Sequence, residues 1–173
     1  EIIYSYFFRP TIVPRTPQPY SSDSIGDFHR AEEYAFGPYK ASILVDASHG
    51  ENVYSVTSPA NGDSMLHGIV AEVASQIRNV PQVTPKSTRL LSLDELLQIR
   101  NHEASKITRQ RYPELPQKLS SSLAELSCYE SIGIGSISAF LIDDNVEEFF
   151  IDQPGAPIYL DHRKWGRCKT NVI

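Results

Sequence analysis

Apolar residues recur at helical spacing between residues 63 and 78, directly after the turn signal Asn61-Gly62-Asp63. The recurring positions are Met65, Leu66, Ile69, Val70, Val73, Ala74 and Ile77. Their i, i+1, i+4, i+5 spacing places them on one face, so the pattern predicts an amphipathic helix over residues 63–78. Because proline is incompatible with a helix interior, we expect this helix to end before Pro81.

A second helix is predicted over residues 92–111. A capping box marks its start, since Ser92 and Glu95 can each satisfy a free backbone amide of the other. An apolar stripe follows, formed by Leu93, Leu96, Leu97, Ala104 and Ile107. The dipeptide Tyr112-Pro113 predicts the end of the helix.

A third helix is predicted to begin at Pro116, because proline is tolerated in the first turn, where its missing N–H is not needed. Its face is supplied by Leu119, Leu123, Leu126 and Tyr129 or Glu130. Gly133 and Gly135 predict its end. A short helix containing Ile137, Phe140 and Leu141 is expected next.

Two pairs of short strands are predicted from β-branched and aromatic residues. Residues 41–46 and 52–57 flank Ser48-His49-Gly50 and indicate one hairpin. Residues 146–152 and 157–162 flank a Pro-Gly turn and indicate another. Helices and short antiparallel hairpins in one chain predict the α+β class.

Regular structure is expected to be scarce in the N-terminal part of the chain. Five prolines lie in residues 1–38, at Pro10, Pro14, Pro17, Pro19 and Pro38. An aromatic cluster there, Tyr4, Tyr6, Phe7 and Phe8, is interpreted either as an arm tucked into the core or as a partner-binding strand. We therefore expect an extended arm over residues 1–38, an α+β subdomain over 39–113 and a second subdomain over 114–173.

Composition and charge limit the possible functions of the chain more than they limit its possible folds. At 173 residues, 40% hydrophobic and 21% charged, the chain is typical of a globular protein. Its net charge of −5 argues against general affinity for nucleic acid, so no nucleic-acid partner is expected and any anion contact must be local. No run approaches the roughly 18 apolar residues of a membrane span. Two cysteines, Cys128 and Cys168, make no disulfide framework and favour a reduced compartment.

Recognisable catalytic motifs are missing. The sequence has no phosphate loop, no dinucleotide fingerprint and no zinc-protease motif, and Gly133-Ile-Gly135 follows a helix rather than a strand. The five histidines and two cysteines have no metal-ligand spacing, so no metal site is expected. The acidic pairs Asp143-Asp144 and Glu147-Glu148 are interpreted as solvated surface, with a catalytic carboxylate pair as the alternative.

A cluster of cations near the C-terminus is the strongest candidate for a site. It comprises His162, Arg163, Lys164 and Arg167, with Trp165 among them. Arginine matches phosphate oxygens in a bidentate fashion, and the end of a strand holds it at a fixed angle. Such an arginine can complete a phosphate site built by another domain. The alternative is a charged hairpin edge that discourages strand addition.

The same region resembles a known family. The segment VEEFFIDQPGAPIYLDHRKWGRCKTNV (146–172) is similar to part of the archaeal type II and type IV secretion ATPases, the motors of archaella and type IV pili. The matching positions are Asp143, Val146, Glu147, Glu148, Pro157, Ile158, Tyr159, His162, Arg163, Gly166, Thr170 and Asn171. The lead-in GIGSISAFLIDD (133–144) departs from the family pattern at Ser136 and Ala139, and residues 37–46 and 52–59 match an N-terminal hairpin more loosely.

The resemblance implies that ATP is bound and hydrolysed by a part of the protein outside this chain. Members of the family are hexameric ATPases whose N-terminal region moves over a RecA-like core that binds ATP and Mg²⁺ and lies beyond Ile173. No cofactor and no activity are therefore expected for this chain, while its parent protein is expected to be an ATPase. Since the chain begins with Glu1 and stops within a β pattern, we expect a fragment of that parent.

The resemblance also names partners and contact residues. It implies contacts with the ATPase core of the same protein, with neighbouring subunits of a homohexamer and with a membrane-embedded platform protein, at the cytoplasmic face of the cell membrane. Arg163 and Arg167 are the candidates for the residue that approaches the nucleotide phosphates, with residues just after Ile173 as the alternative. The alternative, from another class, is a self-contained protein-interaction module without a nucleotide role. An independent enzyme would need a polar constellation that the sequence does not display.

Overall fold

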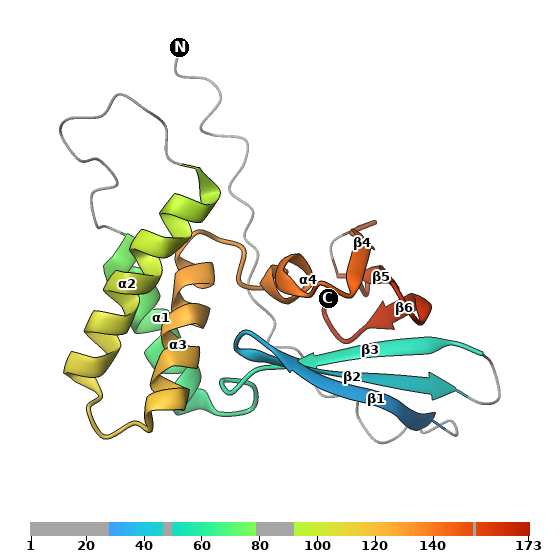
Figure 1. Ribbon diagram of the computed structural model, residues 1–173, viewed down its shortest axis with the longest axis horizontal. Coiled ribbons are helices and arrows are strands. Elements are labelled where there is room, and N and C mark those ends of the chain that lie inside the picture. The colour runs from blue at the N-terminus through green and yellow to red at the C-terminus, as the bar shows by residue number, and fades with distance from the viewer. Residues whose placement is uncertain (1–27, 47–49, 79–91, 154) are drawn as a thin grey trace, which may run out of the picture.

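A computed structural model describes residues 28–46, 50–78, 92–153 and 155–173. Within them lie six strands and four helices, and the α+β class is confirmed. The aromatic cluster at residues 4–8 and the prolines before residue 28 lie outside the described residues, as does Pro81. The chain forms a six-stranded sheet at one side and three packed helices at the other (Figure 1).

The first half of the sheet is an antiparallel meander of β1 (Phe28–Phe36), β2 (Tyr39–Asp46) and β3 (Asn52–Thr57). The predicted hairpin over 41–46 and 52–57 is confirmed as β2 and β3. Strand β1 corrects the expectation of an irregular arm through residue 38. Its alternation is interrupted by a bulge between Arg30 and Glu32, which hid the strand from the sequence pattern.

The second half of the sheet comes from the C-terminal region. It contains β4 (Val146–Phe150), β5 (Tyr159–His162) and β6 (Gly166–Thr170), all antiparallel, and the predicted pairing of 146–152 with 157–162 is confirmed. Strand β6 occupies the region where the sequence indicated a β pattern without defined bounds. The sheet order is β1-β2-β3-β6-β5-β4, with one parallel pair, β3 and β6.

Three predicted helices are confirmed as α1 (Ser64–Arg78), α2 (Leu93–Arg111) and α3 (Gln117–Ser131). The Ser92/Glu95 capping box is present at the start of α2. The fourth helix, α4 (Ser138–Ile142), lies against β4. All three long helices pack together, so the expected boundary between residues 113 and 114 separates two elements, α2 and α3, that belong to one helical unit.

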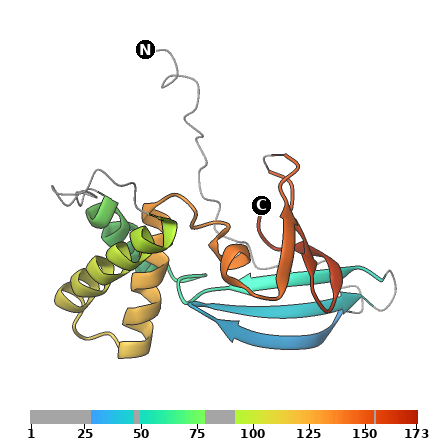
Figure 2. The same ribbon diagram turned by 45° about the horizontal axis from the view of Figure 1, so that its top comes forward.

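One hydrophobic core joins the helical unit to the sheet. Its members from the helices include Ile69, Val73, Ile77 and Leu123, and those from the sheet include Ile43, Tyr54, Leu160 and Cys168. The β4–β5 hairpin stands steeply against the β1–β3 meander, so the sheet is strongly curved (Figure 2). This curvature brings side chains of the edge strand β1 to the end of β5, although three strands lie between them in the sheet order.

Candidate functional site

A buried carboxylate lies where the two halves of the sheet meet. Asp143 follows α4 and is 4% exposed. Its Oδ2 accepts hydrogen bonds from the Tyr34 hydroxyl on β1 at 2.6 Å and from the Tyr54 hydroxyl on β3 at 2.7 Å. Its Oδ1 accepts from the backbone N–H of Asn145 at 2.9 Å and from the side-chain amide of Asn145 at 3.1 Å. Four donors occupy both oxygens, so Asp143 ties together three segments that are distant in sequence.

The two tyrosines act as donors in this network. Burial raises the pKa of Tyr54 and of Tyr34, and their hydrogen bonds to Asp143 raise each pKa further. The neutral hydroxyl is therefore favoured in both, because an ionised hydroxyl beside the carboxylate would place two negative charges in a buried site. Both side chains remain hydrogen-bond donors throughout the neutral pH range.

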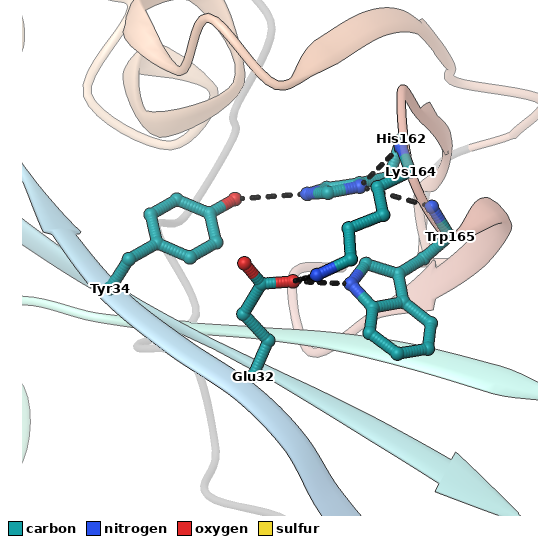
Figure 3. A network of polar contacts seen from close by, with 5 residues as sticks. All are labelled: Glu32, Tyr34, His162, Lys164 and Trp165. Atoms are coloured by element: carbon teal, nitrogen blue, oxygen red, sulfur yellow. Dashed lines mark hydrogen bonds and ion pairs between the residues drawn. The ribbon is translucent and has the colours of Figure 1, made fainter.

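His162, at the end of β5, joins this network to the cationic turn (Figure 3). Its Nδ1 accepts hydrogen bonds from the backbone N–H groups of Lys164 at 3.2 Å and Trp165 at 3.3 Å. Its Nε2 lies 3.2 Å from the Tyr34 hydroxyl. The imidazole is 3% exposed, and burial lowers the pKa of His162 below its ordinary value. The cation expected at this position is instead a buried imidazole that shapes the turn.

Glu32 on β1 holds the other side of the turn (Figure 3). Its Oε2 accepts a hydrogen bond from the Trp165 indole N–H at 2.6 Å and pairs with the Lys164 ammonium at 2.9 Å. Hydrogen bonds from Lys164 and then from Trp165 lower the pKa of Glu32. Asn52 donates to the carbonyl of Trp165 at 2.7 Å, so β3 also contacts the turn.

The side chain of Arg163 pairs with a residue of β4. Its backbone N–H donates to the carbonyl of Asn145 at 2.8 Å, which fixes the residue at the end of the hairpin. Its guanidinium makes one ion pair, with Glu147 at 3.5 Å, and both side chains are more than half exposed. Exposed pairs of this kind contribute about 0–1 kcal/mol, so the guanidinium is held weakly.

Arg167 lies on the outward side of β6. Its guanidinium carbon is 4.2 Å from the centroid of the Phe150 ring and 5.9 Å from that of Tyr159. Its Nε is 4.0 Å from Asp161, the residue opposite it on β5. Arg167 thus covers two aromatic rings that would otherwise be more open to water, a contact typical of cation–π pairs.

The structure therefore divides the cationic cluster by role. His162 is buried, and Lys164 contacts Glu32, while Arg163 and Arg167 are exposed and pair with different carboxylates. Sequence reasoning missed the partners on β1, which it assigned to an irregular arm. A local signal for them is the spacing of the two aromatic residues Tyr34 and Phe36, which lie two positions apart after the bulge on β1.

The acidic residues and cysteines form no second site in the part of the chain described. Asp143 is buried, while Asp144, Glu147 and Glu148 are exposed. Cys128 and Cys168 are buried free thiols, and burial raises the pKa of each to about 11. Within residues 28–46, 50–78, 92–153 and 155–173, no three His, Cys, Asp or Glu side chains gather in a geometry suited to a metal ion.

The fold and site together define an α+β domain with a curved mixed sheet, a buried polar network and two exposed arginines near one hairpin. No protein-family model matches the chain, and a search of curated proteins found no match either. Among the described helices, none has the length and apolar character needed to cross a membrane.

Proposed function

We propose that this chain is the N-terminal regulatory and docking region of a hexameric secretion or filament-assembly ATPase. Its role is to couple ATP hydrolysis in a C-terminal RecA-like core to a membrane platform protein. ATP and Mg²⁺ belong to that core, and neighbouring subunits of the hexamer are further partners. The expected location is the cytoplasmic face of the cell membrane, as a peripheral protein. The support comes from the residues that carry the family resemblance.

One observation carries the proposal. Several residues of the resembling pattern have an evident role in folding: Asp143 and His162 join the strands, and Asn171 pairs with both backbone groups of Val56 at 2.9 Å. Arg163 belongs to the same pattern, yet its side chain makes one weak, exposed ion pair. Among the described residues, the guanidinium of Arg163 has this one weak ion pair, which leaves it available to bind an external anion.

The geometry suits a phosphate contact across a domain interface. The backbone of Arg163 is fixed by Asn145, and the turn that follows is held by His162 and Glu32. A rigid turn that presents a weakly paired guanidinium reduces the entropy lost when the guanidinium binds phosphate. Arg167 would first have to leave the Phe150 ring, so Arg163 is the better placed of the two.

The test is the ATPase activity of the protein that contains this chain together with its core. We expect Arg163→Ala to lower turnover by roughly a hundredfold or more, the scale seen when a charge at the transferred phosphate is removed. Arg167→Ala is measured in parallel. Arg109→Ala is the matched control, because Arg109 is an exposed cation on α2 and its removal should leave turnover unchanged.

Unchanged turnover in both Arg163→Ala and Arg167→Ala, with folding intact, would contradict the phosphate contact. The isolated chain gives a second check, since we expect it to hydrolyse no ATP. ATP hydrolysis by a contaminant-free sample of the isolated chain would be inconsistent with a docking region if it persisted after both arginines were substituted.

A second candidate is a self-contained protein-interaction module. The observation that favours it is the exposure of Leu93 (56%) and Ile99 (43%) on α2, which leaves both apolar side chains available to a partner. Loss of partner binding in Leu93→Ser and Ile99→Ser, with unchanged ATPase activity in the arginine variants, would favour this function.

A further inference from the structure

The hydrogen bonds around His162 determine where its proton lies. Nδ1 faces two backbone N–H donors, from Lys164 and Trp165, so this nitrogen must be an acceptor and carries no proton. The remaining proton is then on Nε2, which lies 3.2 Å from the Tyr34 hydroxyl. The observed contacts therefore require the neutral imidazole in its Nε2–H tautomer.

The neighbouring donors agree with this assignment. Tyr34 donates its own proton to Asp143, so its oxygen is free to accept from His162 Nε2–H. Tyr54 donates to the same carboxylate oxygen, and Asn145 donates to the other. The chain of hydrogen bonds runs in one direction, from His162 through Tyr34 to Asp143, and each proton has one acceptor.

The turn that His162 holds is also what connects β1 to the β5–β6 hairpin. Strand β1 is at the edge of the sheet and forms its backbone ladder with β2. Its contacts with the distant hairpin are made by side chains: Glu32 with Lys164 and Trp165, and Tyr34 with His162. His162 accepts hydrogen bonds from the backbone N–H groups of Lys164 and Trp165, so one imidazole orients both residues.

We propose that His162 is a proton-controlled latch: the neutral imidazole closes β1 onto the β5–β6 turn, and protonation of Nδ1 opens this contact while the rest of the fold remains. A proton on Nδ1 would point at two N–H donors, so both hydrogen bonds are lost and the turn is pushed away. Lys164 and Trp165 then leave Glu32. This inference goes beyond the proposed function and does not depend on it.

The charges that face His162 set the pH range of the latch. Asp143 from the α4–β4 loop and Glu32 from β1 favour protonation, whereas Lys164 and Arg163 from the turn oppose it; Tyr34 and Tyr54 contribute neutral rings. Burial is the largest effect, and it lowers the pKa of His162. A histidine with a lowered pKa in the folded state stabilises that state above its unfolded pKa of about 6.5, and this contribution is lost as the pH falls.

The experiment uses Trp165, the one tryptophan of the chain, as a reporter. We expect its fluorescence to change between about pH 6.5 and pH 4.5, toward the longer-wavelength emission of a water-exposed indole, while the far-UV circular dichroism stays constant. The range stops at pH 4.5 because Glu32, whose pKa is lowered from 4.5, titrates below it. An unchanged fluorescence spectrum, or a simultaneous loss of circular dichroism, would overturn the latch.

Two variants separate His162 from the other histidines. In His162→Asn the side-chain oxygen takes the place of Nδ1 and still accepts the two amides but does not titrate, so the transition should disappear. His102→Asn, at an exposed position on α2, should keep it. A transition retained in His162→Asn would overturn the proposal. If this variant does not fold, NMR of the wild-type imidazole at pH 7.5 decides, because finding the proton on Nδ1 rather than Nε2 would overturn it equally.

Discussion

Asp143 is a single buried carboxylate that hydrogen-bonds several segments of the chain. It accepts hydrogen bonds from β1, from β3 and from the backbone directly after α4. A buried donor that loses its acceptor costs about 1–3 kcal/mol, so the network is sensitive to removal of its centre. The adjacent Asp144 is exposed, which makes the pair a natural comparison.

We expect Asp143→Ala to lower the free energy of unfolding by about 3 kcal/mol or more, because two tyrosine hydroxyls and the Asn145 amide lose their acceptor. Urea denaturation measures this change. Asp144→Ala should shift it by no more than about 0.5 kcal/mol. Equal effects of the two substitutions would show that the network does not stabilise the fold.

For single residues, the sequence indicated that the arginines of a charged hairpin are exposed but did not indicate which polar residues are buried. Arg163 and Arg167 are exposed, as a charged hairpin implies. His162 was grouped with them because it is next to Arg163 in sequence, yet its partner Tyr34 is 128 positions away. Adjacent residues on a strand point to opposite faces, and without the partner strand the sequence does not reveal which face is buried.

Among the elements, those with local signals were predicted and those without them were not. The capping box of Ser92 and Glu95 marked the start of α2, and the glycine-rich segment after α3 marked its end. Strand β1 is polar, bulged and at the sheet edge, features that protect edges from aggregation and also mask the strand pattern. Its existence depends on β2, with which it pairs.

The β1–β2 turn is one of the places where the sheet approaches the helices, and Gly37 tests this contact. Gly37 has a φ of +47°, and a Cβ there would lie 2.9 Å from Ile142 and 3.3 Å from Glu125. Gly62 also has a positive φ, +78°, but open space around it. We expect Gly62→Ala to cost about 1 kcal/mol of stability through backbone strain.

Gly37→Ala should cost more than Gly62→Ala by about 0.5–1.5 kcal/mol, because the close atoms are the ends of the Ile142 and Glu125 side chains, which must leave their present rotamers to make room. Thermal or urea unfolding of both variants gives the difference. A Gly37→Ala variant that lost less stability than Gly62→Ala would contradict the close contact with Ile142 and Glu125.

For the whole molecule, the helical unit of α1–α3 is an insertion in the sheet. Residues 64–131 leave after β3, and the chain returns through α4 and β4 so that β6 pairs in parallel with β3. Local periodicity predicted the helices and hairpins, but it carries no information on pairing across such an insertion. The expected division at residues 113 and 114 lies between α2 and α3, inside this insertion.

Because several tyrosines and both thiols are buried, we expect the free energy of unfolding to decrease at alkaline pH. Burial raises the pKa of Tyr39 to about 12 and that of Tyr34, Tyr54 and Tyr129 as well. In the unfolded chain tyrosines ionise near pH 10 and thiols near pH 8.5. The folded state then binds more protons, so the free energy of unfolding decreases as the pH rises above about 8.5, most steeply beyond 10.

We expect the urea midpoint to be lower at pH 11 than at pH 8. Phenolate absorbance should show that several tyrosines of the folded protein ionise later than those of the urea-unfolded chain. Coincident titration curves for the two states would rule out this explanation.

The parallel pair of β3 and β6 has a consequence for how the protein is made. Val56 and Asn171 are hydrogen-bonded across 115 positions, whereas the helices and the β1–β3 meander rest on short-range contacts. On a ribosome the meander and the helical unit are complete before β6 exists, and contacts of long sequence separation form slowly. Asp143 precedes β6 in the chain and can therefore bind Tyr34 and Tyr54 earlier, whereas the β3 edge of the sheet has no partner until β6 is made, so we expect this edge to be open in the nascent chain.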